Sequence, residues 1–184
     1  MYKFLMILIL PYLLFAKSAT LTSIIDGDSV VLKDGKTNVV CHLGDLDALE
    51  VRVNSKLKRE MRKCKFSKKE FLDAGLLSLN HAKSILKIGT KYEYTIERYF
   101  PNKNPVCHLK IPKGLHVELS PYFDKLMISS GFALPYVIYS EPKYSQTLLK
   151  LAKEAKKQKK GLWKSHFNLM KCLVEQRYSL RSLR

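Results

Sequence analysis

The sequence predicts an α+β fold, mainly β, in which a small closed or nearly closed barrel of about five strands carries about three helices. Two observations lead to this prediction. Hairpin-like β units occur at about residues 24–50 and 92–111, and helical patterns lie between and after them. With 184 residues, the chain is long enough for one globular domain with a proper core and too short for two large ones.

The first hairpin places several carboxylates at one end of the expected sheet. Residues 30–32 and 39–43 are β-prone runs joined by Asp34-Gly35, a pair typical of tight hairpin turns. Antiparallel pairing of these runs would bring the flanking carboxylates together, an arrangement that suits a hard cation such as calcium. Asp45 is either a further cation ligand or a solvated turn residue. The flanking carboxylates are Asp26, Asp28, Asp45, Asp47 and Glu50.

A strongly basic segment follows this acidic stretch. From Arg52 to Lys69 the chain has nine basic residues and one acidic residue, Glu60. We expect a mobile basic loop here, which is either simply solvated or in contact with phosphate groups.

Three helices and a second hairpin are expected in the rest of the chain. The first two helices show capping signals at their starts, and glycines end all three. Alternating residues at 92–97, resumed at 106–111, predict the second hairpin. The helices are bounded by Ser67 with Glu70 and Gly89, by Ser120-Pro121 and Gly131, and by about residues 145 and 160.

The N-terminal residues are interpreted as an export signal. Lys3 precedes an apolar run over residues 4–16, and small residues at 16 and 18 provide a cleavage site. An uncleaved anchor helix is the alternative, although the run is shorter than the ~20 residues that a membrane span needs. We therefore expect residues 1–18 to be a signal peptide, residues 20–164 a folded domain and residues 165–184 a basic tail that is helical in part.

The excess of positive charge favours a polyanionic partner. The formal net charge is +17, and it would still be +15 without residues 1–18, because only Lys3 and Lys17 are lost with them. Nucleic acid, an anionic membrane and an acidic polysaccharide all remain open on charge alone.

Four cysteines lie in the part of the chain that would be exported, where oxidation is permitted. They allow three disulfide pairings, and none has the Cys-x-x-Cys spacing of a zinc site. Free buried thiols are the alternative for the two that lie in apolar strand contexts, Cys41 and Cys107. The other two are Cys64 and Cys172.

The chain resembles the thermonuclease (staphylococcal nuclease-like) family over nearly all of residues 22–164. The resemblance rests on Ile25-Asp-Gly-Asp-Ser-Val30, on Leu46-Asp-Ala-Leu-Glu50, on the order of strands and helices, and on the closing residues 155–163. It implies a five-stranded barrel of the oligonucleotide-binding (OB) type with three helices. It also implies hydrolysis of phosphodiester bonds in DNA and RNA with calcium (Ca2+).

The resemblance further implies roles for particular residues. Asp28, Asp47 and the backbone carbonyl of Ala48 match the family's calcium ligands. Glu50 matches the glutamate that positions or deprotonates the attacking water, as phosphodiester hydrolysis requires. The positions that match tyrosines in contact with the bound nucleotide are Tyr136 and Tyr139.

Both arginines that the family directs at the phosphate are missing from their expected positions. His42 stands at the first, Asn104 or Pro105 at the second, and Leu49 replaces a proline before Glu50. A guanidinium makes two fixed bonds to a phosphate, and losing one such donor commonly costs about a hundred- to thousandfold in rate. His42 itself is either a structural strand residue or a proton carrier. The cations that could compensate are Arg98, Lys103 and Arg52.

Two functions follow from these observations, and a third stays open. The first is an exported calcium-dependent nuclease of weakened efficiency. The second is a non-catalytic module that binds nucleic acid, and the third is an envelope protein whose basic face rests peripherally on a membrane of anionic lipid. We expect the protein to be a monomer.

Overall fold

A closed β-barrel forms one end of the molecule in the computed structural model, which describes residues 17–99, 104–112 and 121–184. The strands follow the order β1-β2-β3-β6-β5, and β5 pairs back onto β1. Neighbours are antiparallel except β3 and β6, which are parallel. The predicted OB-type α+β fold is therefore confirmed. The barrel strands are β1 (Lys17–Ile24), β2 (Ser29–Asp34), β3 (Thr37–Leu43), β5 (Lys91–Tyr99) and β6 (Pro105–Lys110).

Alternating side chains fill the barrel. Tyr92 and Tyr94 of β5 are buried, as are Leu21 of β1 and Leu32 of β2, while Glu93, between the two tyrosines, faces outward. Lys17, at the start of β1, pairs with Tyr94. The predicted signal therefore overlaps this strand, and cleavage after residue 18 would remove the first two residues of β1.

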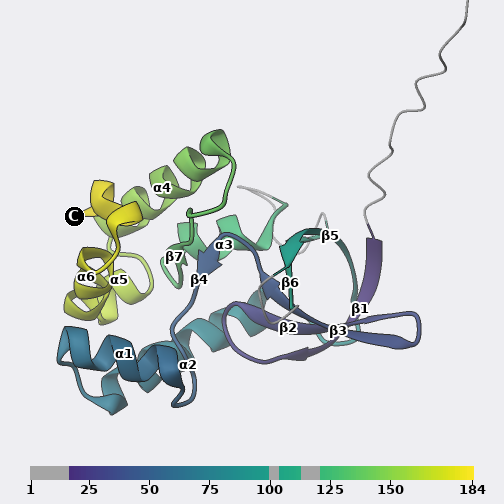
Figure 1. Cartoon of the computed structure of the whole chain (residues 1–184), viewed down its shortest axis with the longest axis horizontal. Helices are drawn as coiled ribbons and strands as arrows, with labels where there is room; N and C mark the ends of the chain where they lie inside the picture. The colour runs from purple at the N-terminus through teal and green to yellow at the C-terminus, as the bar shows by residue number, and fades with distance from the viewer. Residues whose placement is uncertain (1–16, 100–103, 113–120) are drawn as a thin grey trace, which may run out of the picture.

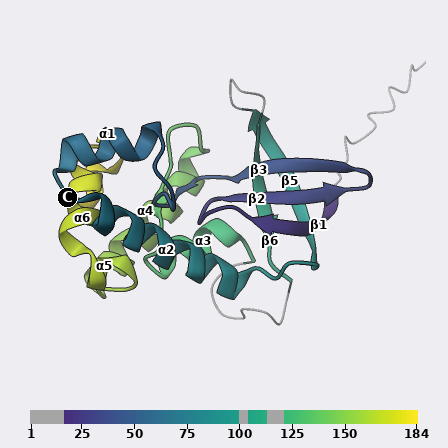
Figure 2. The ribbon, with the colours of Figure 1, turned by 90° about the horizontal axis from the view of Figure 1, so that it is seen from below.

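Helices form the other end of the molecule (Figures 1 and 2). In both views α1, α4, α5 and α6 lie at the end opposite the barrel, and α2 runs from there toward the barrel. The described residues contain six α-helices where about three were expected. They are α1 (Ser55–Cys64), α2 (Lys68–Ile85), α3 (Phe123–Ser129), α4 (Pro142–Lys157), α5 (Leu162–Ser165) and α6 (Phe167–Glu175), followed by a 3-10 helix, η1 (Tyr178–Leu183).

The expected basic loop was wrong, because much of it is helix α1. Asn54 caps the helix by accepting a hydrogen bond from the Leu57 backbone amide. Leu57 is fully buried, and Met61 and Cys64 follow it at helical spacing. A narrow apolar stripe under a basic surface therefore suffices to fix this segment against the core.

The other helices differ from expectation mainly at their ends. The capping box of Ser67 and Glu70 is present at the start of α2, but α2 ends at Ile85 rather than at Gly89. Helix α3 has Tyr122 as its N-cap, without a side-chain bond, and Ser120 lies outside the described residues. Helix α4 begins at Pro142 and ends at Lys157, about three residues earlier at each end than expected.

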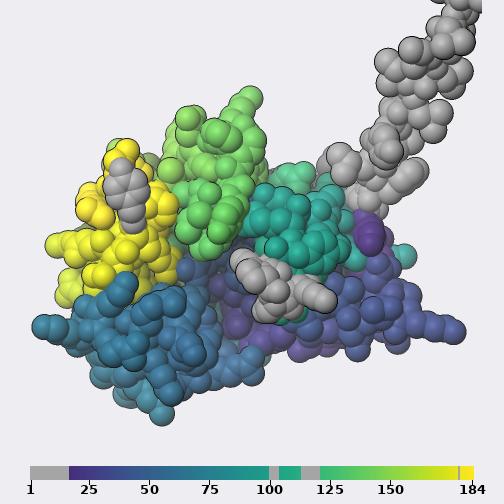
Figure 3. All heavy atoms as spheres, viewed as in Figure 1, coloured from purple at the N-terminus to yellow at the C-terminus, as the bar shows by residue number. Residues whose placement is uncertain are grey.

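The C-terminal residues are folded against the rest of the molecule. Leu169, Met170, Leu173 and Val174 of α6 are buried in the common core, as is Leu180 of η1. Figure 3 shows the C-terminal residues lying directly against those of α1 on one face. The residues that were expected to form a basic tail therefore pack beside α1.

Two disulfides tie the elements together. Cys41–Cys107 joins the parallel pair β3 and β6, and Cys64–Cys172 joins α1 to α6. The alternative of free buried thiols at Cys41 and Cys107 is therefore wrong.

A short ladder outside the barrel connects the acidic stretch to the later helices. Strand β4 (Leu46–Asp47) pairs with β7 (Leu134–Pro135), so that Asp47 lies opposite Leu134. This pairing brings Tyr136 close to the acidic residues in space. Across residues 17–99, 104–112 and 121–184, no helix is both long and apolar enough to cross a membrane.

Candidate active site

A cleft of about 1170 Å³ lies where the acidic end of the barrel meets α1 and the C-terminal residues. The predicted convergence of carboxylates is present, because the hairpin places the start of β2 beside the chain that follows β3. Tyr136 and Asn104 also line the cleft. Its charged lining residues are Asp26, Asp28, Asp47, Glu50, Glu60, Arg52, Lys56, Arg59, Lys63 and Arg177.

Asp28 fastens the two acidic segments to each other. One of its carboxylate oxygens accepts from the Ala48 backbone amide at 2.8 Å, and the other accepts from the Ser29 hydroxyl at 2.9 Å. The Nδ1 atom of His42 lies 3.6 Å from Asp28 Oδ1. Burial raises the pKa of Asp28, and it lowers the pKa of His42, so His42 is neutral at pH 7. The Asp28 carboxylate thus holds Ala48 in place within the site.

Lys56 of α1 places its ammonium among the acidic residues. Its Nζ contacts Asp47 Oδ1, and it lies 2.9 Å from both the Ala48 carbonyl oxygen and Glu50 Oε1. Burial by itself would lower the pKa of Lys56, but the charges of Asp47, Asp28 and Glu50 outweigh it and raise that pKa. The ammonium is therefore charged across the whole neutral range.

Both oxygens of Glu50 are engaged. Oε1 faces Lys56, and Oε2 accepts from the Asn54 side-chain amide at 2.6 Å. The backbone of Glu50 is held from behind by α2, where a Cβ on Gly75 would lie 2.1 Å from the Glu50 carbonyl oxygen. Only glycine allows this close approach of helix and loop. The carboxylate is thus fixed against Lys56 and Asn54.

Arg177 supplies a second cation from the far end of the chain. Its Nη2 lies 2.6 Å from Asp47 Oδ2 and 3.1 Å from Glu60 Oε1. Burial would raise the pKa of Asp47, but the charges of Lys56 and Arg177 outweigh it and lower the pKa. Asp47 is therefore ionised and paired on both of its oxygens.

A calcium ion does not fit these residues together with Lys56. The resemblance assigns calcium to Asp28, Asp47 and the Ala48 carbonyl, and oxygen ligands of this kind suit a hard cation. The same oxygens of Asp47 and Ala48 already accept from the Lys56 ammonium. An ion and the ammonium would need the same space and the same lone pairs.

The remaining predicted residues divide between the cleft and its surroundings. Arg52 is exposed and lines the cleft, as does the half-buried Tyr136. Tyr139 lies outside the cleft lining, 62% exposed, with its ring 6.4 Å from that of Tyr136. Lys103 lies outside the described residues.

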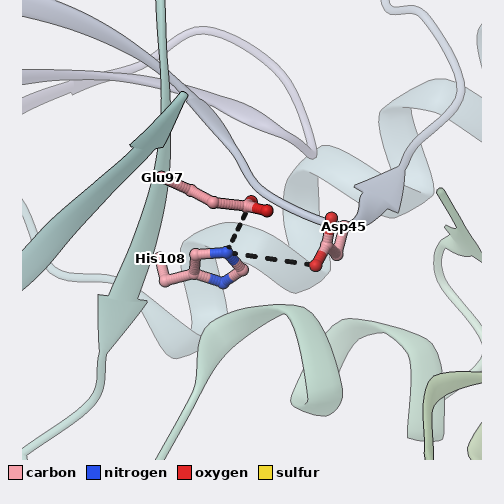
Figure 4. A group of neighbouring side chains, drawn as sticks. All are labelled: Asp45, Glu97 and His108. Carbon is pink, nitrogen blue, oxygen red and sulfur yellow. Dashed lines mark hydrogen bonds and ion pairs between the residues drawn. The ribbon is translucent and has the colours of Figure 1, made fainter. Parts of the chain in front are cut away.

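Arg98 faces a different group of side chains. It forms an ion pair with Glu97, its Nη2 lies 3.5 Å from Asp45 Oδ1, and its guanidinium lies over the Tyr139 ring at 5.2 Å. Figure 4 shows His108 directed at the same two carboxylates, 3.0 Å from Glu97 and 3.9 Å from Asp45. Arg98 is thus committed to a neighbouring ionic cluster, and the cleft lining does not include it.

The ionic cluster of Asp45, Glu97, Arg98 and His108 explains why Asp45 is buried. The residue is 2% exposed and has φ of 57°, a left-handed conformation that aspartate tolerates better than most side chains. The ligand atoms of Asp45, Glu97 and His108 lie within 4.8 Å of one another, so this is a possible metal-binding group. Arg98 and His108 already supply positive charge to it. Asp45 is therefore not a solvated turn residue, and it does not line the cleft that contains Asp28.

His108 is held in its charged form by the carboxylates around it. Burial by itself would lower its pKa, but hydrogen bonds to Asp124 and Glu97 and the charge of Asp45 raise it to about 9.

Sequence reasoning missed Lys56, Asn54, Glu60 and Arg177. A signal for α1 was present, since Asn54 is a favoured capping residue and Leu57 and Met61 stand four apart. Recognising that helix would have placed Lys56 in its first turn, close to Glu50 in the preceding loop. No local pattern marks Arg177, whose approach depends on how α6 packs against α1.

The family model described as staphylococcal nuclease homologue matches residues 115–165. Within the described part of the chain, this segment includes α3, β7, α4 and α5, and therefore the side of the cleft that carries Tyr136. The acidic residues from 26 to 50 lie outside it. No curated protein matches the chain.

Proposed function

From the premise that the chain carries a staphylococcal nuclease-like domain, we propose that its cleft binds single-stranded nucleic acid. One observation carries this proposal: three carboxylates of the cleft, those of Asp47, Glu50 and Glu60, are paired with Lys56 or Arg177, whereas three further cations on its wall are exposed. These exposed cations are Arg52, Arg59 and Lys63.

The layout suits a strand of phosphates and bases. Arg59 and Lys63 stand four residues apart on one face of α1, and Arg52 precedes that helix. Tyr136 offers an aromatic ring on which an unpaired base can stack, which favours single strands over duplex. The internal pairing of the carboxylates lowers their repulsion of phosphate.

Salt titration of oligonucleotide binding tests the proposal. Three phosphate contacts on a single strand give a slope of about −2 for the logarithm of affinity against the logarithm of salt concentration. Replacing Arg59→Gln together with Lys63→Gln should make this slope shallower by about 1.4. Fluorescence anisotropy of a labelled oligothymidine measures both slopes.

Lys91→Gln is the matched control, because Lys91 is an exposed cation on β5 that does not line the cleft. It should leave the slope unchanged. Failure of the wild-type protein to bind DNA or RNA oligonucleotides at low salt would refute the proposal.

Hydrolysis with calcium is the second candidate, and it is favoured by the fact that Asp28, Asp47 and Glu50 all line one cleft. It requires that Lys56 leave these residues when ion and substrate arrive. Digestion of single-stranded DNA with calcium and with a chelator tests it. A rate equal to that of Glu50→Gln under both conditions would exclude this activity.

We also propose that the protein is exported and acts as a monomer. The apolar run at residues 4–16 supports export, as do the two disulfides, which are typical of oxidising compartments. Cell fractionation and mass spectrometry of the mature N-terminus test export. Flotation with anionic vesicles tests peripheral membrane contact, which the net charge would favour.

A further inference from the structure

The Lys56 ammonium is fully satisfied by the acidic residues around it. An ammonium group has three hydrogens to donate. Here three acceptors meet them: Asp47 Oδ1, the Ala48 carbonyl oxygen and Glu50 Oε1. The side chain is 24% exposed, so this arrangement is largely shielded from water.

The backbone around Lys56 fixes this position. Asn54 uses both ends of its side chain, accepting from the Leu57 amide at 2.9 Å and donating to Glu50 at 2.6 Å. Leu57 is fully buried directly after Lys56. The same capping residue thus orients both the helix that carries the ammonium and the carboxylate that receives it.

The far end of α1 is also anchored. Cys64 is bonded to Cys172 of α6, and Arg177, which follows α6, bonds both Asp47 and Glu60. Lys56 therefore lies on a helix that is held at both ends, and Asp47 has a cation on each of its oxygens.

We propose that Lys56 is a resident cation that takes the place of a divalent ion in this cleft, so that the wild-type protein binds no calcium there and removal of the ammonium creates a calcium site. This inference concerns the same cleft as the proposed function, but it does not depend on nucleic-acid binding; it excludes the second candidate function, hydrolysis with calcium.

Competition favours the lysine. A tethered ammonium is present at high effective concentration and loses no translational freedom on pairing, whereas a calcium ion must be taken from dilute solution. The ion would also have to break three charge-assisted bonds at once. Without the ammonium, Asp28, Asp47, Glu50 and the Ala48 carbonyl are a set of oxygens that a hard cation prefers.

Thermal unfolding of the intact disulfide-bonded protein in millimolar calcium and in chelator tests the inference. The wild-type midpoint should be the same in both. The Lys56→Ala midpoint should rise by about 5 to 10 °C at a calcium concentration one hundred times the dissociation constant. Isothermal titration with calcium chloride should show one site in Lys56→Ala and none in the wild type.

Lys58→Ala is the control, because Lys58 is exposed on the same helix and does not line the cleft. It should behave as the wild type does. If Lys56→Ala fails to fold in chelator, recovery of its folded state on adding calcium supports the inference. Lys56→Gln, which is one atom shorter than lysine and keeps a neutral donor, provides the second variant.

Three results would overturn the inference. One is a calcium-dependent midpoint in the wild type that disappears in Asp47→Asn. Another is a folded Lys56→Ala that does not respond to calcium. The third is that both lysine variants remain unfolded with and without the ion. Each result leaves the oligonucleotide titration unaffected, so the two proposals fail separately.

Discussion

Removing the Cys64–Cys172 disulfide should lower the free energy of unfolding by several kcal/mol. The bridge closes a loop over a sequence separation of 108 residues. In the chain-entropy account, a loop of this length restricts the unfolded state by about 5 kcal/mol. The Cys41–Cys107 bridge overlaps this loop and shortens the covalent path from Cys64 to Cys172 in the unfolded chain. The correction is small, because the entropy of loop closure depends on the logarithm of the path length.

The perturbation is the double variant Cys64→Ala/Cys172→Ala. Its free energy of unfolding, measured by guanidinium denaturation without reductant, should fall by about 3 to 5 kcal/mol. The loss should be concentrated at α6, because the bridge attaches that helix to α1. Amide hydrogen exchange should therefore show faster exchange in α6 than in the barrel strands.

The matched control is Cys41→Ala/Cys107→Ala. Its bridge spans 66 residues, for which the same account gives about 4 kcal/mol, but it joins strands that also pair through their backbones. A loss below about 1 kcal/mol for the first variant, or α6 amides exchanging as slowly as in the wild type, would refute the reasoning that this bridge holds α6 to α1.

Two further predictions concern packing behind the site and the ionic cluster beside it. Gly75→Ala should destabilise the protein by about 1 to 2 kcal/mol in urea, because crowding against the Glu50 carbonyl outweighs the gain of about 1 kcal/mol in helix propensity; a more stable variant would contradict this. The pKa of His108 is raised to about 9 in the folded state, compared with about 6.5 in the unfolded state. Its contribution to the free energy of unfolding is therefore fully present below about pH 6.5 and is lost as the pH rises through about 9. Between pH 6 and pH 10 the free energy of unfolding of the wild type should therefore fall by on the order of 1 to 3 kcal/mol more than that of His108→Asn. Equal falls in both proteins would contradict the role of Asp124 and Glu97 in holding the charge.

Local patterns in the sequence were sufficient for the barrel and for the meeting of the acidic segments. The Asp34-Gly35 turn and the alternation in β5 are short-range signals, and pairing of the two strands at that turn necessarily brings Asp28 near Asp47. These contacts follow from backbone geometry, which a sequence pattern reports directly.

The cations of the site could not be placed in the same way. Arg98 was expected near the cleft, but the irregular pairing between Ile96 and Arg98 and the left-handed turn at Asp45 direct it to another cluster. Arg177 reaches Asp47 only because α6 packs on α1. Such contacts depend on tertiary packing between distant residues, for which a single sequence carries no local signal.

The pairing of Asp47 and Glu60 with Arg177 affects the order in which the molecule can assemble. The carboxylates belong to the first third of the chain, whereas their guanidinium partner comes within the last ten residues. During synthesis, the acidic residues of the cleft are therefore made before this partner is. Its final electrostatic state is reached only when the C-terminal helices dock, which makes docking of α6 the step that completes the site.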